Sequence, residues 1–264
     1  MDTYTHGHAD AVLQSHRWRT AQNSAGYLLP LLHPGLELLD VGCGPGTITV
    51  DLARIVAPGK VLGLDIANAP LNEARDLAAR AEIAVDFAVG DVYDLQLADD
   101  SVDVVHAHQM LQHLTDPVAA LREMARVCRP GGVIAVREVD YAATTWFPAD
   151  EGLDHWLRVY SETARRNDAE PDAGRRLRSW AHAGGLRDIT ATTSAWCYAT
   201  DVERAWWGNS WAGRATASSF AEQAVAYGLA TPAELAEIAA AWLRWAAADD
   251  GWLSFLHGEL LIRV

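Results

Sequence analysis

The chain has 264 residues, of which 50% are hydrophobic, and a formal net charge of −14. This length and composition predict a packed core in one large α/β domain, or one domain with a cap, and the chain is short for two full domains. The excess of 35 acidic over 21 basic residues opposes binding to phosphate backbones, so nucleic acid is not an expected partner.

Three further features bear on where the protein works. No apolar run approaches the roughly 20 residues of a membrane-spanning helix, so no membrane span is expected. The first residues show neither the basic start nor the apolar segment of a secretory signal. The cysteines, Cys43, Cys128 and Cys197, are widely spaced, which disfavours a disulfide scaffold or a zinc ribbon. We therefore expect a cytoplasmic protein, and the sequence leaves open whether it is a monomer or a homodimer.

The first half of the chain alternates between short apolar runs and helical patterns. A helical apolar pattern over residues 10–32 comes first, and a glycine cluster at 42–46 follows the first apolar run. Asp116 and Pro117 are the residue types that begin a helix at the N-cap and N1 positions. This alternation predicts βαβ units and a parallel sheet. The expected strands are residues 36–41, 60–65, 84–89, 102–108 and 133–139.

After residue 140 the pattern becomes mainly helical. A helical excursion over 144–170 and a helix over 171–183 precede an alternating strand at 186–198. A second helical insertion covers 201–250, and its clearest helix starts at Thr231, which has the capping-box spacing. Residues 255–264 are expected to form the last strand.

The expected fold class is therefore α/β, with a Rossmann-like, doubly wound sheet of seven strands whose last two form an antiparallel edge. An N-terminal helix and two helical cap insertions complete the expected single domain. Its expected parts are a helical lid (1–32), a core (33–140), cap insertions around the sixth strand (141–200 and 201–250) and the last strand (251–264).

The glycine cluster is the most informative segment. Gly42, Gly44 and Gly46 form a G-x-G-x-G turn directly after the strand-end carboxylate of Asp40. The dinucleotide fingerprint would need glycine where Thr47 stands. An acid beside the glycines suits a ligand with positive charge better than a pyrophosphate.

Two further acids end the next two strands. Asp65 stands 23 residues after Gly42, where a carboxylate can accept hydrogen bonds from both hydroxyls of a ribose. Asp91 ends the third strand and is placed to accept from an exocyclic amine. Each acid alone could be a loop-starting cap, but three at corresponding strand ends predict one nucleoside-like ligand.

In combination, these motifs resemble class I S-adenosylmethionine (SAM)-dependent methyltransferases of the branch that includes ubiquinone/menaquinone-biosynthesis C-methyltransferases. The resemblance covers roughly residues 15–140, and Pro70 departs from it mildly. It implies SAM as cofactor and S-adenosylhomocysteine as product. The matching segments are 39–46, 63–66, 90–92, 101–105 with 108–114, and 121–132. The cofactor-binding residues that it implies are Asp40, Gly42, Gly44, Gly46, Asp65, Ile66, Gly90, Asp91 and Val92.

One match lies before the first strand. The segment from Arg19 to Ala21 is similar to one in glycine N-methyltransferase, whose arginine holds the SAM carboxylate. Arginine can clamp a carboxylate through two N–H donors, whereas the alternative is a solvated helix arginine. Tyr4, His8 and His16 belong to the same segment, which we expect to close over the cofactor.

For methyl transfer, the protein mainly has to bind the cofactor and the acceptor, align them, and exclude water. Candidates for this chemistry lie after the fourth and fifth strands. We expect His108 beside the transferred methyl group and within the cofactor site, and His113 or Tyr141 as a base. Other candidates at these strand ends are His106, Gln109, Glu138 and Asp140. His6 and His8, with His106 and His108, invite a metal interpretation, but no carboxylate or cysteine stands at ligand spacing, so no metal is expected.

The acceptor should be a small, apolar or aromatic molecule, because 10 of the 11 tryptophans follow residue 140, where the cap is expected. Trp206 and Trp207 cannot both face one core on a helix, so one of them should be exposed or line a cavity. For Trp242, Trp245 and Trp252, core packing is the better interpretation. A SAM-binding regulator without catalysis and an NAD(P)-dependent reductase are the alternatives, and the sequence does not distinguish O-, N- or C-methylation.

Overall fold

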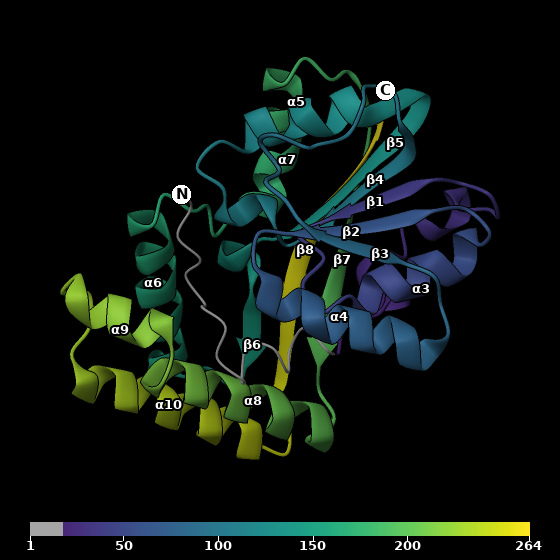
Figure 1. Ribbon diagram of the computed structural model, residues 1–264. Helices are drawn as coiled ribbons and strands as arrows, with labels where there is room; N and C mark the ends of the chain where they lie inside the picture. The colour runs from purple at the N-terminus through teal and green to yellow at the C-terminus, as the bar shows by residue number, and fades with distance from the viewer. Residues whose placement is uncertain (1–17) are drawn as a thin grey trace.

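The computed structural model describes residues 18–264, and Figure 1 shows one sheet with helices on both faces. Tyr4, His6, His8 and His16 lie outside the described residues. The parallel part of the sheet has the order β3-β2-β1-β4-β5. Its strands are β1 (Leu38–Val41), β2 (Val61–Asp65), β3 (Asp86–Val89), β4 (Val102–His108) and β5 (Cys128–Val139).

The last strand of the chain lies inside the sheet. β8 (Trp252–Arg263) pairs antiparallel with β5 on one side and with β7 (Asp188–Tyr198) on the other, so β7 forms the edge. The predicted antiparallel pair of final strands and the Rossmann-like α/β class are confirmed. An eighth strand, β6 (Thr145–Phe147), forms at the start of the segment 144–170 that was predicted to be helical. It pairs with Trp252–Ser254 of β8. Pairing with β8 holds these β-branched and aromatic residues extended, and the helix begins only after Pro148.

Helices cover both faces of the sheet, and each face has its own hydrophobic core between the helices and the strands. On one face, Ile48 and Leu52 of α3 (Thr47–Val56) pack with Val104 and Val133 of the strands. On the other face, α5 (Pro117–Val127) and α7 (Ala173–Ala183) cover β4 and β5. Because strand side chains alternate between two covered faces, all four residues of the central strand β1 are buried. α4 (Asn68–Ala81) packs beside β3.

Four helices form a cap, of which one precedes β7 and three lie between β7 and β8 in the chain. Figure 1 shows β7 and β8 extending from the sheet toward these helices. The cap consists of α6 (Glu151–Arg166), α8 (Asp201–Thr216), α9 (Ser219–Ala226) and α10 (Pro232–Ala247). The predicted capping box is present, because Glu234 N donates to Thr231 Oγ1 (3.2 Å) and Thr231 N donates to Glu234 Oε2 (2.7 Å).

The tryptophans mostly pack the cap. Trp242 and Trp245 are buried in its core, as predicted, together with Trp156 and Trp211. The prediction is wrong for Trp252, which is 40% exposed. Trp252 begins β8, where its side chain points away from the core.

The continuous helix predicted over 10–32 is wrong in its described part. Only α2 (Ala21–Ser24) and a 3-10 turn, η1 (Leu29–Leu31), are helical there. Thr20 caps α2, since Asn23 N donates to its Oγ1 (3.2 Å), and Pro30 cannot continue a helix. The apolar residues of this segment are nevertheless part of the core, because Ala25 and Leu28 are buried against α3.

Candidate active site

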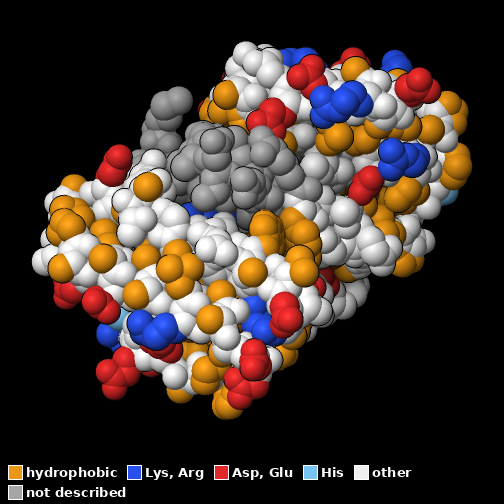
Figure 2. Space-filling model, turned by 90° about the horizontal axis from the view of Figure 1, so that it is seen from below, with side chains coloured by type: hydrophobic (Ala, Val, Ile, Leu, Met, Phe, Trp, Pro, Cys, Tyr) orange, Lys and Arg blue, Asp and Glu red, His pale blue; other side chains and the backbone are white. Residues whose placement is uncertain are grey.

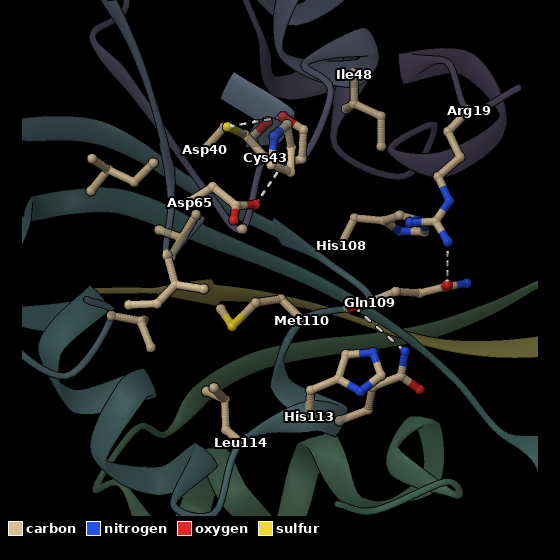
Figure 3. Close-up of a pocket in the computed structure, with 18 of the residues that line it drawn as sticks. Arg19, Asp40, Cys43, Ile48, Asp65, His108, Gln109, Met110, His113 and Leu114 are labelled. Carbon is tan, nitrogen blue, oxygen red and sulfur yellow. Dashed lines mark hydrogen bonds between the residues drawn. The ribbon is translucent and has the colours of Figure 1, made fainter. Parts of the chain in front are cut away.

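A cavity of about 570 Å³ opens at the carboxyl ends of the parallel strands, beneath the cap. This volume falls within the range of roughly 300–1,000 Å³ that is usual for ligand sites. Its walls come from the glycine turn, the ends of β2 to β5, β8 and α8. Figure 3 shows Asp65, His108 and Arg19 arranged around it.

The glycine turn requires glycine for two separate reasons. Gly42, Gly44 and Gly46 have φ values of +71°, +55° and +76°, in the left-handed region that other residues rarely adopt. A Cβ on Gly42 would also lie 2.6 Å from Cγ of Met110. Gly42 and Gly44 therefore present backbone alone to the cavity, whereas Gly46 packs near Ala74 and Phe87 and does not line it.

Asp40 lies behind this turn rather than open to the cavity. Its Oδ2 accepts a hydrogen bond from Thr49 Oγ1 (2.5 Å), and its Oδ1 lies 2.7 Å from His106 Nδ1. Asp40 and His106 are both buried, although Asp40 also contributes to the cavity wall. Both carboxylate oxygens are thus engaged within the protein, which fixes the turn against β4.

The Asp65 carboxylate is held by backbone N–H groups. Gly44 N donates to its Oδ2 (2.9 Å) and Ala67 N to its Oδ1 (3.0 Å). Each oxygen keeps a second lone pair that can accept from a ligand. Ile66, which is 59% exposed, lines the cavity beside it.

The third strand contributes a similar turn. Gly90, Asp91 and Val92 line the cavity, and Asp91 Oδ1 accepts a hydrogen bond from Tyr93 N (2.9 Å). Val92 is buried whereas Asp91 is exposed. The turn therefore offers one apolar surface and one carboxylate to the same ligand.

A chain of hydrogen bonds orients Arg19. Its Nη2 donates to Gln109 Oε1 (2.7 Å), and Gln109 Nε2 lies 2.8 Å from His257 Nε2. Arginine only donates, so the Gln109 oxygen faces Arg19 and its amide N–H faces His257. His257 Nε2 must then accept, and its Nδ1 donates to the Phe255 carbonyl (3.0 Å). Burial lowers the pKa of His257 well below its usual value, which favours this neutral ring.

His108 and His113 both line the cavity. His108 is buried, and neither of its ring nitrogens has a hydrogen-bond partner within residues 18–264. Burial, with the nearby charge of Arg19, lowers the pKa of His108 well below its usual value. Burial likewise lowers the pKa of His113 to about 3. Both rings are neutral near pH 7.

The three candidate residues at and after the end of β5 have different roles. Tyr141 lines the cavity, and burial raises the pKa of its phenol, so it remains a neutral hydrogen-bonding group. Asp140 forms a two-bond ion pair with Arg175, with both distances 2.6 Å. Glu138 Oε1 accepts from Met110 N (2.9 Å) and Leu111 N (2.8 Å), which fixes the loop that carries His113.

Aromatic side chains from β7, β8, α8 and the turn after β5 form one wall of the cavity. Trp196, Trp207 and Phe255 line the cavity with Tyr141, and the guanidinium of Arg214 lies among them. Trp207 therefore satisfies the expectation that one of the two adjacent tryptophans lines a cavity. Phe255, His257 and Arg214 were missed by the sequence analysis, because nothing in the pattern of β8 or α8 indicates which face meets the cavity.

Within residues 18–264, no group of three or more His, Cys, Asp or Glu is arranged to hold a metal ion. The same part of the chain contains no helix with the length and apolar character needed to cross a bilayer.

The sequence of this chain is similar to those of known methyltransferases. A family model described as "Methyltransferase domain" matches residues 32–192. An uncharacterized methyltransferase of Schizosaccharomyces pombe is 31% identical, over 98% of this chain and 96% of the relative. A demethylmenaquinone methyltransferase of Mycolicibacterium paratuberculosis is 33% identical, over 67% of this chain and 74% of the relative.

Solved structures agree on the fold. The YcgJ protein of Bacillus subtilis superposes with a TM-score of 0.59 at 16% identity, covering 90% of this chain and 97% of the other. The [4+2]-cyclase SpnF superposes with a TM-score of 0.52 at 23% identity, covering 94% and 80% of the two chains.

Proposed function

Because the chain belongs to the class I SAM-dependent methyltransferases, we propose that its cavity binds SAM at the glycine turn and transfers the methyl group to a small aromatic acceptor. Family membership supersedes the reductase alternative, which the threonine at position 47 already disfavoured. The observation that carries the proposal is the continuity of one cavity, from the glycine turn to the aromatic wall.

The residues around the turn fit the cofactor. Asp65 keeps one free lone pair on each carboxylate oxygen, which suits the two hydroxyls of a ribose. Asp91 accepts from the exocyclic amine of adenine, while Val92 and Ile66 cover the ring. Gly42 and Gly44, which line the cavity without a side chain, let the methionyl part approach closely. Asp40 acts by fixing this turn, since its carboxylate is buried between Thr49 and His106.

Arg19 holds the methionyl carboxylate. Its guanidinium projects into the cavity and is positioned by Gln109. Two N–H donors on one planar group match a carboxylate better than a lysine ammonium would. SAM, when bound, supplies the electrophilic methyl carbon, and the protein supplies its position.

His108 lies beside the transferred methyl group. Its neutral ring adds no positive charge next to the sulfonium, and its ring nitrogens remain available for hydrogen bonds. A neutral His113 can take a proton, although the pKa of about 3 makes it a weak base. The acceptor's nucleophilic atom gains the methyl carbon as the C–S bond breaks, and the electron pair of that bond stays on sulfur. The acceptor proton leaves to His113 or to water.

The aromatic wall supports a flat, small acceptor. Trp196 and Trp207 are rigid rings that bury ligand surface at low entropic cost. The relative from Mycolicibacterium paratuberculosis is named for demethylmenaquinone, which also carries a ring system. On the face that Figure 2 shows, acidic and basic side chains are interspersed with hydrophobic ones over the described part of the surface. Together with the charge of −14, this distribution does not suit a polyanionic acceptor.

An acceptor screen tests the proposal. The protein is incubated with SAM and with phenols, indoles, quinols, a tRNA and a peptide, and S-adenosylhomocysteine release is measured. Turnover of at least one aromatic compound is expected. Turnover of only tRNA or peptide would refute the aromatic acceptor, and SAM binding without any turnover would favour the regulator alternative.

A further inference from the structure

We propose that the atom that receives the methyl group is the oxygen of a neutral aromatic hydroxyl, and that the ring of His108 binds this hydroxyl. The inference rests on the proposed function and narrows its acceptor to phenol-like molecules that are methylated on oxygen. It is carried by one buried imidazole in the cavity, whose two ring nitrogens have no hydrogen-bond partner within residues 18–264.

The position of His108 connects the two parts of the cavity. His108 ends β4, which pairs with β1, the strand that leads into the glycine turn. Its ring centroid lies 5.5 Å from that of Trp196 and 6.3 Å from that of His257, and both of these residues line the cavity. Figure 3 shows the His108 ring among the residues that line the cavity. A group bound to this ring therefore lies between the glycine turn and the aromatic wall.

The ring nitrogens of His108 lack partners although the side chain is only 5% exposed. A buried polar group without a hydrogen bond is costly, and native proteins usually complete it with a protein group, a water or a ligand. His106, two residues earlier on the same strand, is held by Asp40, whose Oδ1 lies 2.7 Å from its Nδ1. No described side chain holds His108 in this way, so its ring fits a bound group better than a purely structural role.

The ionisation state of His108 specifies which groups it can bind. Burial lowers its pKa well below the usual value, and the charges of Arg19 and Arg137 lower it further, so the ring is neutral near pH 7. A neutral imidazole has one nitrogen that accepts a hydrogen bond and one that donates. A hydroxyl can donate to the first or accept from the second, so it satisfies the ring in either tautomer. An aromatic carbon can do neither.

The surrounding charges favour a neutral hydroxyl over an amine. The guanidinium groups of Arg19 and Arg137 lie beside Trp196, with their Cζ atoms 5.6 Å and 4.8 Å from its ring centroid. A protonated amine at His108 would meet the same positive charges that keep the imidazole neutral. The uncharged hydroxyl of a phenol avoids this repulsion, and its ring can pack against the aromatic wall.

The transfer step balances with His108 in this role. A lone pair of the hydroxyl oxygen forms the new O–C bond as the C–S bond breaks, and the electron pair of the C–S bond stays on sulfur. The oxygen becomes strongly acidic as it gains the methyl group, so even a weakly basic ring can take its proton along the existing hydrogen bond. His108 then passes the proton to water. The products are the methyl ether and S-adenosylhomocysteine.

Calorimetry with two isosteric indoles tests the proposal on the full-length chain loaded with S-adenosylhomocysteine. 5-Hydroxyindole carries a neutral hydroxyl, and 5-fluoroindole replaces it with an atom of similar size that cannot donate a hydrogen bond. We expect the hydroxyindole to bind about tenfold more tightly. His108→Phe should reduce this preference to within about twofold, because phenylalanine keeps a ring but has no nitrogens. His108→Gln should retain part of it, because an amide can accept and donate. When SAM replaces S-adenosylhomocysteine, the product should be 5-methoxyindole, identified by mass spectrometry and NMR.

The matched control is His182→Phe, which alters an exposed histidine of α7 and should change neither affinity. Equal binding of the two indoles by the unaltered protein, or binding of neither, would overturn the inference, as would an unchanged preference in His108→Phe. Methylation of 5-hydroxyindole on carbon or nitrogen would also overturn it. If His108→Phe does not fold, the comparison of the two indoles in the unaltered protein and in His108→Gln still decides. Failure to bind SAM, or the absence of turnover in the whole acceptor screen, would instead refute the proposed function.

Discussion

Gln109 and His257 are 148 positions apart in the chain, yet their Nε2 atoms lie 2.8 Å from each other beneath the cavity. Gln109 also accepts from Arg19, so a residue of the last strand fixes the orientation of an arginine before the first strand. Gln109 has a φ of +51°, in the left-handed region, which turns its side chain to meet both partners. The insertion of β8 beside β5 makes this contact possible.

The first prediction concerns this chain of hydrogen bonds. Gln109→Leu should weaken SAM binding about tenfold, because Arg19 loses the partner that orients it toward the methionyl carboxylate. Binding of 5′-methylthioadenosine, which lacks that carboxylate, should stay within about twofold. Calorimetry with both ligands measures the difference, and Gln96→Leu on the surface is the control. An equal loss for both ligands would show that Gln109 supports the cavity in general rather than Arg19.

A second prediction concerns the ribose contact. Asp65→Ala should weaken SAM binding by about 2–4 kcal/mol, because a pair of charge-assisted hydrogen bonds is lost. Asp91→Ala should cost less, since backbone groups near Val92 can still pair with adenine. Here 5′-methylthioadenosine should lose as much affinity as SAM, in contrast to Gln109→Leu. Unchanged SAM affinity in Asp65→Ala would show that Asp65 does not bind the cofactor.

The glycine turn gives a third prediction. Gly42→Ala should lower thermal stability and SAM affinity, because left-handed φ costs about 1–2 kcal/mol for alanine and the new Cβ would meet Met110. The double variant Gly42→Ala with Met110→Ala should recover part of the loss by removing the clash. Thermal unfolding and calorimetry on both variants measure this. If the double variant recovers nothing, backbone strain alone accounts for the effect.

Much of this site could be predicted from the sequence, because its cofactor half is local. The glycines and the acids Asp65 and Asp91 follow directly after apolar runs, and parallel strands bring such ends to one edge. The acceptor half could not be predicted in this way. Arg214 and His257 reach the cavity only through the packing of α8 and the insertion of β8, which periodicity does not encode.

The two errors in secondary structure have similar causes. Strand β6 exists because Thr145–Phe147 pairs with Trp252–Ser254, a contact made more than 100 residues away along the chain. The helix predicted before β1 is interrupted because Thr20 and Pro30 outweigh an apolar spacing that was correctly identified. In both cases a local pattern was compatible with two structures, and tertiary contacts selected one.

A fourth prediction separates the two roles of tryptophan. Trp207→Ala should raise the KM for the acceptor about tenfold or more at unchanged SAM affinity, because a wall of the cavity is lost. Trp245→Ala should instead lower thermal stability by about 3–5 kcal/mol, since Trp245 is buried in the cap core. Steady-state kinetics and thermal unfolding of both variants make the comparison. Loss of stability without a change in KM for Trp207→Ala would favour packing alone.

The last prediction concerns the pH dependence of stability. Burial lowers the pKa of His108, His113 and His257 in the folded protein, so the unfolded chain binds more protons below about pH 6.5 and stability falls as pH decreases.

Burial raises the pKa of Glu138 to about 8, so the folded protein retains this proton while the unfolded chain has lost it. The two effects oppose each other above pH 6.5, because histidines of the unfolded chain still lose protons there, so stability should pass through a maximum near pH 7 and then decrease by less than about 1 kcal/mol up to pH 8. Glu138→Gln keeps an oxygen that can accept from Met110 N and Leu111 N, and it should abolish the decrease above about pH 7 while preserving the loss at acidic pH. Urea unfolding across pH 5–8.5 measures both limbs, and an unchanged alkaline limb in Glu138→Gln would show that another group is responsible.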